Sequence, residues 1–114
     1  MGRKVLVVGG DLMAHERIRS AAGPAGAEVD FVSFGGLVPA LESGSPDTLI
    51  VDLDDGREPV LREIEAARAA GTLPNRVLGY YSHVDAELGT AAEAAGVTPV
   101  RRGHFWSSLP SLLS

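Results

Sequence analysis

Short apolar runs alternate along the chain with longer amphipathic segments. The apolar runs lie at residues 5–8, 27–33, 48–53, 76–81 and 97–101. Segments with apolar positions at helical spacing follow them at residues 12–22, 35–43, 58–70, 85–95 and 105–113. Continuous apolar runs are typical of strands covered on both faces, and a spacing of about 3.6 residues indicates a helix with one buried stripe. The pattern therefore predicts a series of strand–helix units from one end of the chain to the other.

Residues at the ends of the segments sharpen this prediction. Asp11 is expected to cap the first helix, because its carboxylate can accept from the free N–H groups of the first turn. Leu12 is expected on the inner face of that helix, and Gly23-Pro24 to stop it. In the last helix, Pro110 is expected to bend or shorten the segment.

Strands that alternate with helices form a parallel sheet, because right-handed crossovers place the helices on both faces. We therefore predict a three-layer α/β/α fold, a flavodoxin-like doubly wound sheet of five parallel strands in the order 2-1-3-4-5, in a single domain over residues 1–114. Ligands of such sheets bind at the carboxyl ends of strands 1 and 3. In this chain Gly9, Gly10, Asp11 and Asp52 are expected there.

Composition narrows the class of protein. Of the 114 residues, 45% are hydrophobic and 22% are charged, as in globular domains. The absence of cysteine excludes disulfides and thiolate metal sites and fits a cytoplasmic protein. No apolar run is long enough for a signal peptide or a membrane helix, so we expect no membrane association. The net charge of −5 and the scattered basic residues argue against a nucleic-acid partner.

Several segments together resemble a response-regulator receiver domain of the CheY-like family. The run at residues 5–8 with its loop and helix is similar to the first unit of that family, and residues 46–53 resemble its third strand. Residues 77–85 resemble the fourth strand with its loop, and residues 93–97 the end of the fourth helix. The resemblance implies a role in two-component signal transduction and places Asp52 on the phospho-acceptor position.

The same resemblance implies a magnesium site whose ligands differ here. Receivers hold Mg²⁺ beside the acceptor with an acidic pair after the first strand, and Gly9 and Gly10 stand at those positions. Transfer of a phosphoryl group to a carboxylate gathers negative oxygens, which a divalent cation normally offsets. Glycine supplies no side-chain oxygen, and Asp11 or Asp54 would substitute only if the loop bent unusually. We therefore expect slow or absent phosphorylation of Asp52, no metal and no cofactor.

Two further receiver positions also carry other residues. The Thr or Ser that contacts the phosphoryl group corresponds to Tyr81, followed by Ser82, and the conserved Lys corresponds to Gly103, preceded by Arg101 and Arg102. Among these receiver positions, only the acceptor position, Asp52, carries the residue that is typical of the family. The chain is therefore expected to be an atypical receiver, or pseudo-receiver.

The residues around Asp52 leave more than one interpretation open. Asp52 is either an active acceptor or a relic that caps backbone N–H groups, the latter being favoured because catalysis needs the whole constellation. With Asp11, Asp54 and Asp55 it forms either a remnant cation site or a solvated loop with a turn at Asp55-Gly56. Gly9-Gly10 is either an anion cradle or a tight turn, and the spacing of a dinucleotide fingerprint is absent.

The histidines and one mixed cluster are expected to have no catalytic role. His15, His83 and His104 lack the spacing of metal ligands. Ser82, His83 and Asp85 contain the residue types of a catalytic triad, but adjacent residues rarely adopt that geometry. We therefore expect no catalytic residues and no enzyme.

Aromatic and arginine residues near strands 4 and 5 and the last helix form a possible interface, because such residues are favoured anchors of protein contacts. They are Tyr80, Arg101, Phe105 and Trp106, with Tyr81 and Arg102 beside them. The alternative is that Phe105 and Trp106 belong to the core.

The sequence leaves three functions open. The favoured one is a signalling module that works by contact with a protein partner or with a second copy of itself, since no output domain is expected beyond Ser114. The alternatives are a phosphate- or nucleotide-binding domain that uses the Gly9-Gly10 loop, or a phosphoacceptor that works through Asp52.

Overall fold

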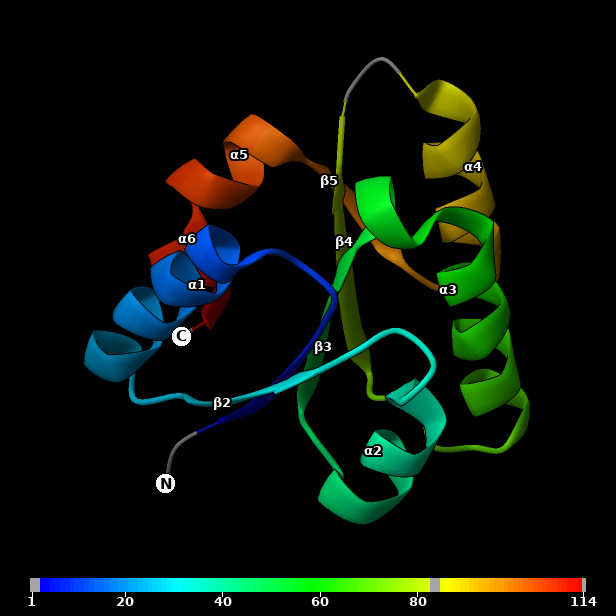
Figure 1. Ribbon diagram of the computed structural model, residues 1–114, viewed down its shortest axis with the longest axis horizontal. Helices are drawn as coiled ribbons and strands as arrows, with labels where there is room; N and C mark the ends of the chain where they lie inside the picture. The colour runs from blue at the N-terminus through cyan, green and yellow to red at the C-terminus, as the bar shows by residue number, and fades with distance from the viewer. Residues whose placement is uncertain (1–2, 83–84, 114) are drawn as a thin grey trace.

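The computed structural model describes residues 3–82 and 85–113, which form one parallel sheet with helices on both faces (Figure 1). The strand order is β2-β1-β3-β4-β5, and every neighbouring pair is parallel. The predicted fold class and strand order are confirmed. The strands are β1 (Lys4–Val8), β2 (Glu28–Val32), β3 (Thr48–Asp52), β4 (Arg76–Tyr81) and β5 (Thr98–Arg101).

The helices divide between the two faces of the sheet. In Figure 1, α1, α5 and α6 lie on one side, and α2, α3 and α4 lie on the other. Their bounds are α1 (Leu12–Ala25), α2 (Leu37–Gly44), α3 (Leu53–Ala69), α4 (Ala86–Ala95), α5 (Arg102–Ser107) and α6 (Leu109–Leu113). None of the helices in the described part of the chain has both the length and the apolar character needed to span a membrane.

The two faces of the sheet carry separate hydrophobic cores. Val5 and Val7 of β1 pack with α1, α5 and α6, whereas Leu6 and Val8 pack with α2, α3 and α4. Successive side chains of a strand point to opposite faces, so a strand between two helical layers is apolar at every position. This explains the unbroken apolar runs in the sequence. At the edge of the sheet, Val29 and Phe31 of β2 are only partly buried.

The first helix begins at Leu12 as predicted, but its last turn and the burial of Leu12 differ from the prediction. The helix continues through Pro24 to Ala25 and is capped by Gly26, whose positive φ of 73° lets its N–H reach the carbonyls of the last turn. Leu12 is 77% exposed rather than buried, because the buried stripe of α1 begins only at Ala14. The sequence signals placed the helix correctly but misjudged its last turn and its first apolar residue.

The third and last helices are each interrupted. A helical turn starts directly at Leu53 instead of at residue 58, and the backbone of Arg57 (φ 46°, ψ −141°) separates this turn from the rest of α3. The expected turn at Asp55-Gly56 is thus part of a helical turn. The predicted helix over residues 105–113 is two short helices, broken at Ser108, with Pro110 in the first turn of α6.

Candidate functional site

Asp52 lies at the carboxyl end of β3 and is only 6% exposed. Its Oδ1 accepts from the backbone N–H of Asp55 at 3.2 Å, so Asp52 is the N-cap of α3. The same oxygen accepts from Nη2 of Arg102 at 3.4 Å. Burial raises the pKa of the Asp52 carboxyl, while the Asp55 N–H and the Arg102 charge act in the opposite direction. The Oδ1 oxygen of the carboxylate therefore already has two protein donors.

Asp54 joins three elements at the same edge of the sheet. Its Oδ1 accepts from the backbone N–H of Ser82 at 2.8 Å, just after β4. Its Oδ2 accepts from Nε of Arg102 at 3.1 Å, at the start of α5. Arg102 thus binds both Asp52 and Asp54, and its guanidinium also lies 5.0 Å from the ring centre of Tyr80. Asp54 faces Ser82 and Arg102 and does not line the cavity beside Asp52.

The two glycines after β1 have backbones that disfavour side chains. Gly9 and Gly10 have φ values of 78° and 89°, where L-residues are strained. A Cβ on Gly9 would lie 2.2 Å from Cζ of Phe34, and a Cβ on Gly10 would lie 3.1 Å from the Tyr80 hydroxyl. The aromatic rings of Phe34 and Tyr80 therefore occupy the space that side chains at these positions would need.

The residues at this edge do not fit the magnesium site that the receiver resemblance implies. The glycines supply no oxygen ligand, and the Asp11 carboxylate accepts from the N–H of Ala14 at 2.8 Å as the N-cap of α1. Asp52 is paired with a guanidinium. Among the residues that the structure describes, no three histidine or acidic side chains are grouped so as to hold a metal ion.

A cavity of about 320 Å³ remains beside the acceptor position, lined by Asp11, Ala14, Asp52, Asp55 and Arg102. The structure thus brings together Asp11 and Asp52, as expected from the topology. Three of the lining side chains are carboxylates and one is a guanidinium. Their combined charge disfavours an anion such as phosphate at this place.

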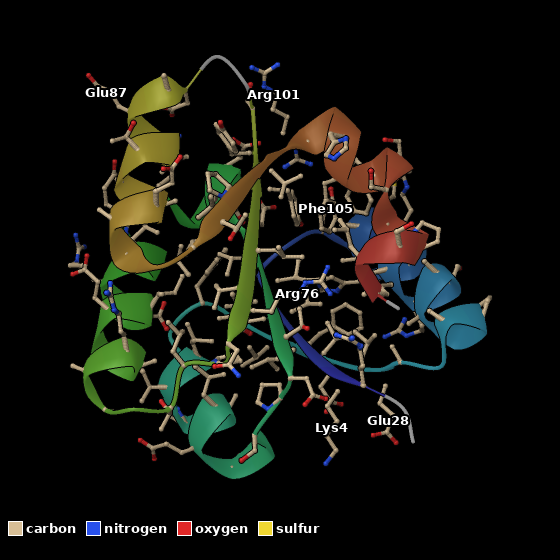
Figure 2. All side chains as sticks on the ribbon, turned by 180° about the vertical axis from the view of Figure 1, so that it is seen from behind. Lys4, Glu28, Arg76, Glu87, Arg101 and Phe105 are labelled. Carbon is tan, nitrogen blue, oxygen red and sulfur yellow. The ribbon has the colours of Figure 1, made fainter. Side chains whose placement is uncertain are left out.

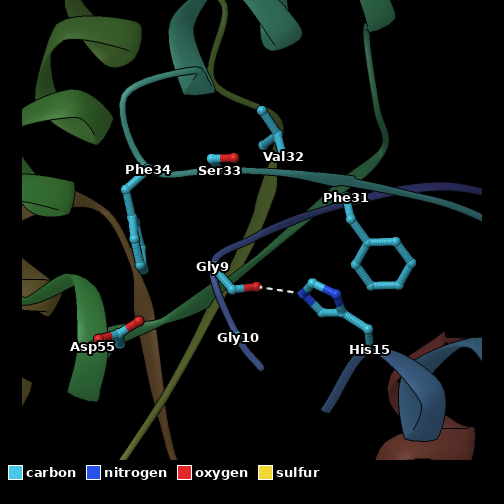
Figure 3. A pocket seen from close by; sticks show the side chains of 8 residues that line it. All are labelled: Gly9, Gly10, His15, Phe31, Val32, Ser33, Phe34 and Asp55. Atoms are coloured by element: carbon cyan, nitrogen blue, oxygen red, sulfur yellow. Dashed lines mark hydrogen bonds between the residues drawn. The ribbon is translucent and has the colours of Figure 1, made fainter. Parts of the chain in front are cut away.

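A second cavity of about 290 Å³ lies beside the glycine loop (Figure 3). His15 donates from Nε2 to the carbonyl of Gly9 at 2.8 Å, and its ring lies 4.2 Å from that of Phe31. The N–H of Gly9 donates to the carbonyl of Val32 at 3.1 Å and is not free to bind a ligand. The cavity is lined by Gly9, Gly10, His15, Phe31, Val32, Ser33, Phe34 and Asp55.

This second cavity gives no support to a phosphate site at the glycine loop. Asp55 is the one acidic or basic side chain, histidine aside, among the described residues that line it, and it is negative. The Asp11 carboxylate also holds the first turn of α1, where an anion would otherwise bind. The arrangement agrees with a tight turn, which was the favoured interpretation of Gly9-Gly10.

The structure brings only some of the expected switch positions to Asp52. Tyr81 lies on the other face of the sheet, where its ring is 3.1 to 3.3 Å from a Cβ built on Gly89 of α4. Gly103 is exposed, and nothing lies within 4 Å of a Cβ built on it. Ser82 contributes its backbone N–H to Asp54. Of these positions, Arg102 is the one whose side chain reaches Asp52.

Tyr80 and Phe105 were expected at a possible interface, and for these two residues the expectation is wrong. Both are 0% exposed, and their rings stack with centres 4.6 Å apart between the sheet and α5. Figure 2 shows Arg101 at the end of β5 and Phe105 between α5 and the sheet. Arg101 is exposed, and Trp106 is half-buried with the Arg17 guanidinium 4.3 Å from its ring centre.

The Tyr80 hydroxyl is a buried polar group that the sequence did not single out. Tyr80 pairs with Asp52 in the register of β3 and β4, so the two side chains share one face. Burial, reinforced by the negative charge of Asp52, raises the pKa of the Tyr80 hydroxyl far above its ordinary value. The hydroxyl makes no hydrogen bond of standard length to the described residues.

The two histidines that the structure describes, His15 and His104, lie in different places. His15 donates to the backbone carbonyl of Gly9 beside the glycine loop, whereas His104 is exposed on α5. His83 lies outside the described residues, so the grouping of Ser82, His83 and Asp85 is not described as a whole. Asp85 itself caps α4 through the N–H of Leu88.

The roles of Asp54, Phe34 and Tyr80 at this edge were missed from the sequence. The comparison with receivers pointed to Tyr81, whereas the strand register places Tyr80 beside Asp52. The one available signal for Asp54 was its position next to the end of β3, and nothing local indicated that it would reach Ser82. Phe34 carried no signal, because its place over Gly9 depends on how two distant loops pack.

Comparison with known proteins bears on the fold. No protein-family model matches the chain, and no curated protein matches its sequence. Among solved structures, a response regulator from Thermotoga maritima is similar with a TM-score of 0.77 and 20% identity, over 98% of this chain and 94% of that one. The chemotaxis response regulator CheY4 of Vibrio cholerae is similar with a TM-score of 0.81 and 18% identity, over 99% and 97%. The chain therefore has the fold of a response-regulator receiver domain.

Proposed function

We propose that this chain is an atypical receiver-like signalling module that acts by protein–protein contact, without efficient magnesium-dependent phosphorylation of Asp52. It is a binding module and not an enzyme. The observation that carries the proposal is the state of the acceptor site. Asp52 caps α3 and pairs with Arg102, and the loop beside it has two glycines where side-chain oxygens would be needed.

Electrostatics supports this proposal. A phosphoryl group on Asp52 would place further negative oxygens in a cavity that already contains the Asp11 and Asp55 carboxylates. Arg102 is the one cationic side chain among the described residues lining that cavity, and Asp54 already shares its charge. Without a divalent cation this charge is not offset, so both transfer and retention of the group are disfavoured.

The surface also offers residues suited to a protein partner or a second copy of the chain. Arg101 is exposed and Trp106 is half-buried, and both residue types are favoured at interfaces. Leu12 and Met13 are 77% and 75% exposed at the start of α1, beside the acceptor site. Apolar side chains of this size gain free energy when a partner covers them.

Exposure to phosphodonors tests the silent acceptor. Wild type and the Asp52→Asn variant are incubated with acetyl phosphate and Mg²⁺, and the intact mass is measured; beryllofluoride binding is followed in parallel by NMR. A receiver with its acidic pair intact is the positive control. We expect no adduct on either form of this chain. Stoichiometric modification of wild type that is absent from Asp52→Asn would overturn the proposal.

Self-association is tested by sedimentation equilibrium over a range of protein concentrations. If the chain forms a homodimer through the residues named above, the Arg101→Glu and Met13→Glu variants shift the equilibrium towards monomer, while the exposed control Glu65→Gln on α3 does not. A wild type that stays monomeric points to a different protein as the partner. If no variant changes either the self-association of the chain or its binding to a partner protein, the assignment of this surface is refuted.

A further inference from the structure

The Asp54 carboxylate receives hydrogen bonds from two parts of the chain that are distant in sequence. Ser82 N–H donates at 2.8 Å to Oδ1 from 28 residues away, and Arg102 Nε donates at 3.1 Å to Oδ2 from 48 residues away. The two donors belong to the end of β4 and to the first residue of α5. Each carboxylate oxygen thus has one donor, and one of the two bonds is made to a cation.

This arrangement has the chemistry of a small oxyanion site. A backbone N–H and a guanidinium N–H converge on one negative group, which is the donor set that carboxylates and other oxyanions bind. The Asp54 side chain is 26% exposed and that of Arg102 is 42% exposed, so the bonds are partly screened from water. Nearby, Arg57 adds an ion pair of 2.6 Å to Asp85 at the start of α4.

We propose that Asp54 is an internal anionic ligand. Its carboxylate fills an oxyanion site formed by the Ser82 N–H and the Arg102 guanidinium, and it thereby joins α3, β4 and α5 without any external ligand. This inference deepens the proposed function, because it names what holds the silent acceptor site in one arrangement. The inference also depends on the proposed function, according to which the site works without a phosphoryl group.

The surroundings define which external anion would replace Asp54. Oδ1 of Asp52 lies 3.4 Å from Nη2 of Arg102, so a replacement shares the guanidinium with a second carboxylate. Repulsion between negative groups grows with their charge. A small monoanion such as formate is therefore the expected ligand of a site emptied by removal of Asp54, and dianionic phosphate is expected to bind more weakly.

Carboxylate rescue tests the inference. In Asp54→Ala both donors lose their acceptor, so exchange of the Ser82 amide hydrogen, followed by NMR, should accelerate about tenfold or more. Sodium formate, compared with sodium chloride at equal ionic strength, should raise the melting temperature of Asp54→Ala by a few degrees and slow that exchange. Wild type should show neither effect, because its site is already filled.

Controls separate a specific site from general ion effects. Glu16→Ala removes the exposed ion pair of Glu16 with Arg19, and formate should not rescue it. The double variant Asp54→Ala/Arg102→Gln should lose the rescue, since the cation is gone. Equal formate effects on wild type, Glu16→Ala and Asp54→Ala would overturn the proposal, as would a Ser82 amide that exchanges at the wild-type rate in Asp54→Ala.

A variant of conserved shape covers the case in which Asp54→Ala does not fold. Asp54→Asn keeps an acceptor for Ser82 but loses its charge, so the Nε–H signal of Arg102 should shift and exchange faster while the Ser82 amide stays protected. An unchanged Arg102 signal would refute the internal ligand. Phosphorylation of wild-type Asp52, by contrast, would refute the proposed function and leave this result standing.

Discussion

Arg57 has a backbone conformation that ordinary residues avoid, and this makes it the sharpest test of the structure. Its φ of 46° and ψ of −141° lie where glycine is tolerated and residues with a Cβ are strained. Such conformations cost on the order of 1–3 kcal/mol. The kink separates the helical turn that carries Asp54 from the remainder of α3, so the strain lies next to the candidate site.

A comparison of Arg57→Gly with Arg57→Ala isolates this strain. Both variants lose the ion pair with Asp85, so that contribution cancels between them. Glycine relieves strain of about 1–3 kcal/mol but adds about 0.5–1 kcal/mol of unfolded-state entropy. We therefore expect Arg57→Gly to be more stable than Arg57→Ala by about 1 kcal/mol.

The matched control is Arg62, an exposed residue of the same helix with a regular helical backbone. There the order should be reversed, with Arg62→Ala more stable than Arg62→Gly by about 1 kcal/mol. Equilibrium urea unfolding of all four variants measures both differences under one set of conditions. If alanine is the more stable residue at position 57 as well, the strained kink does not exist in solution and the reasoning fails.

Three further predictions concern the edge of the sheet around Asp52. Gly9→Ala should lower the free energy of unfolding by about 2–4 kcal/mol, because the new Cβ would lie 2.2 Å from Cζ of Phe34. The control Gly35→Ala, at a φ of 91° with open space around it, should lower it by only about 1–2 kcal/mol. Equal losses for the two variants in urea unfolding would contradict the close contact. Tyr80→Phe removes a buried hydroxyl that lies beside the Asp52 carboxylate without a hydrogen bond of standard length, so it should raise the free energy of unfolding by about 1 kcal/mol. A loss of stability in urea unfolding would show that the contact with Asp52 is a stabilising hydrogen bond. Because the pKa of Asp52 is raised in the folded protein, the native state binds this proton more tightly than the unfolded chain does. Wild type should therefore gain stability relative to Asp52→Asn as the pH falls from neutrality towards 3.8, as measured by urea unfolding across that range. The opposite slope would show that the carboxyl is not desolvated.

The site shows how far local sequence rules reach. The position of Asp52 at the end of a buried strand followed from the apolar run before it, and the capping roles of Asp11 and Asp85 agree with the preferences of helix N-termini. From the sequence, Arg102 was named as a neighbour of the expected lysine position and of the possible interface, and not as a partner of Asp52. Its contact with Asp52 depends on where α5 starts, and that start came three residues earlier than the apolar pattern indicated.

The amino-acid sequence by itself determined the class of fold, because strand and helix periods alternate and right-handed crossovers leave few ways to arrange them. It also determined that no side-chain oxygen follows β1 at Gly9 or Gly10. Only the tertiary structure decided which groups surround Asp52. The register of β3 and β4 placed Tyr80 beside it, and packing between distant loops brought Asp54 to Ser82 and Arg102. Such contacts depend on the relative placement of whole elements, which no local period or motif encodes.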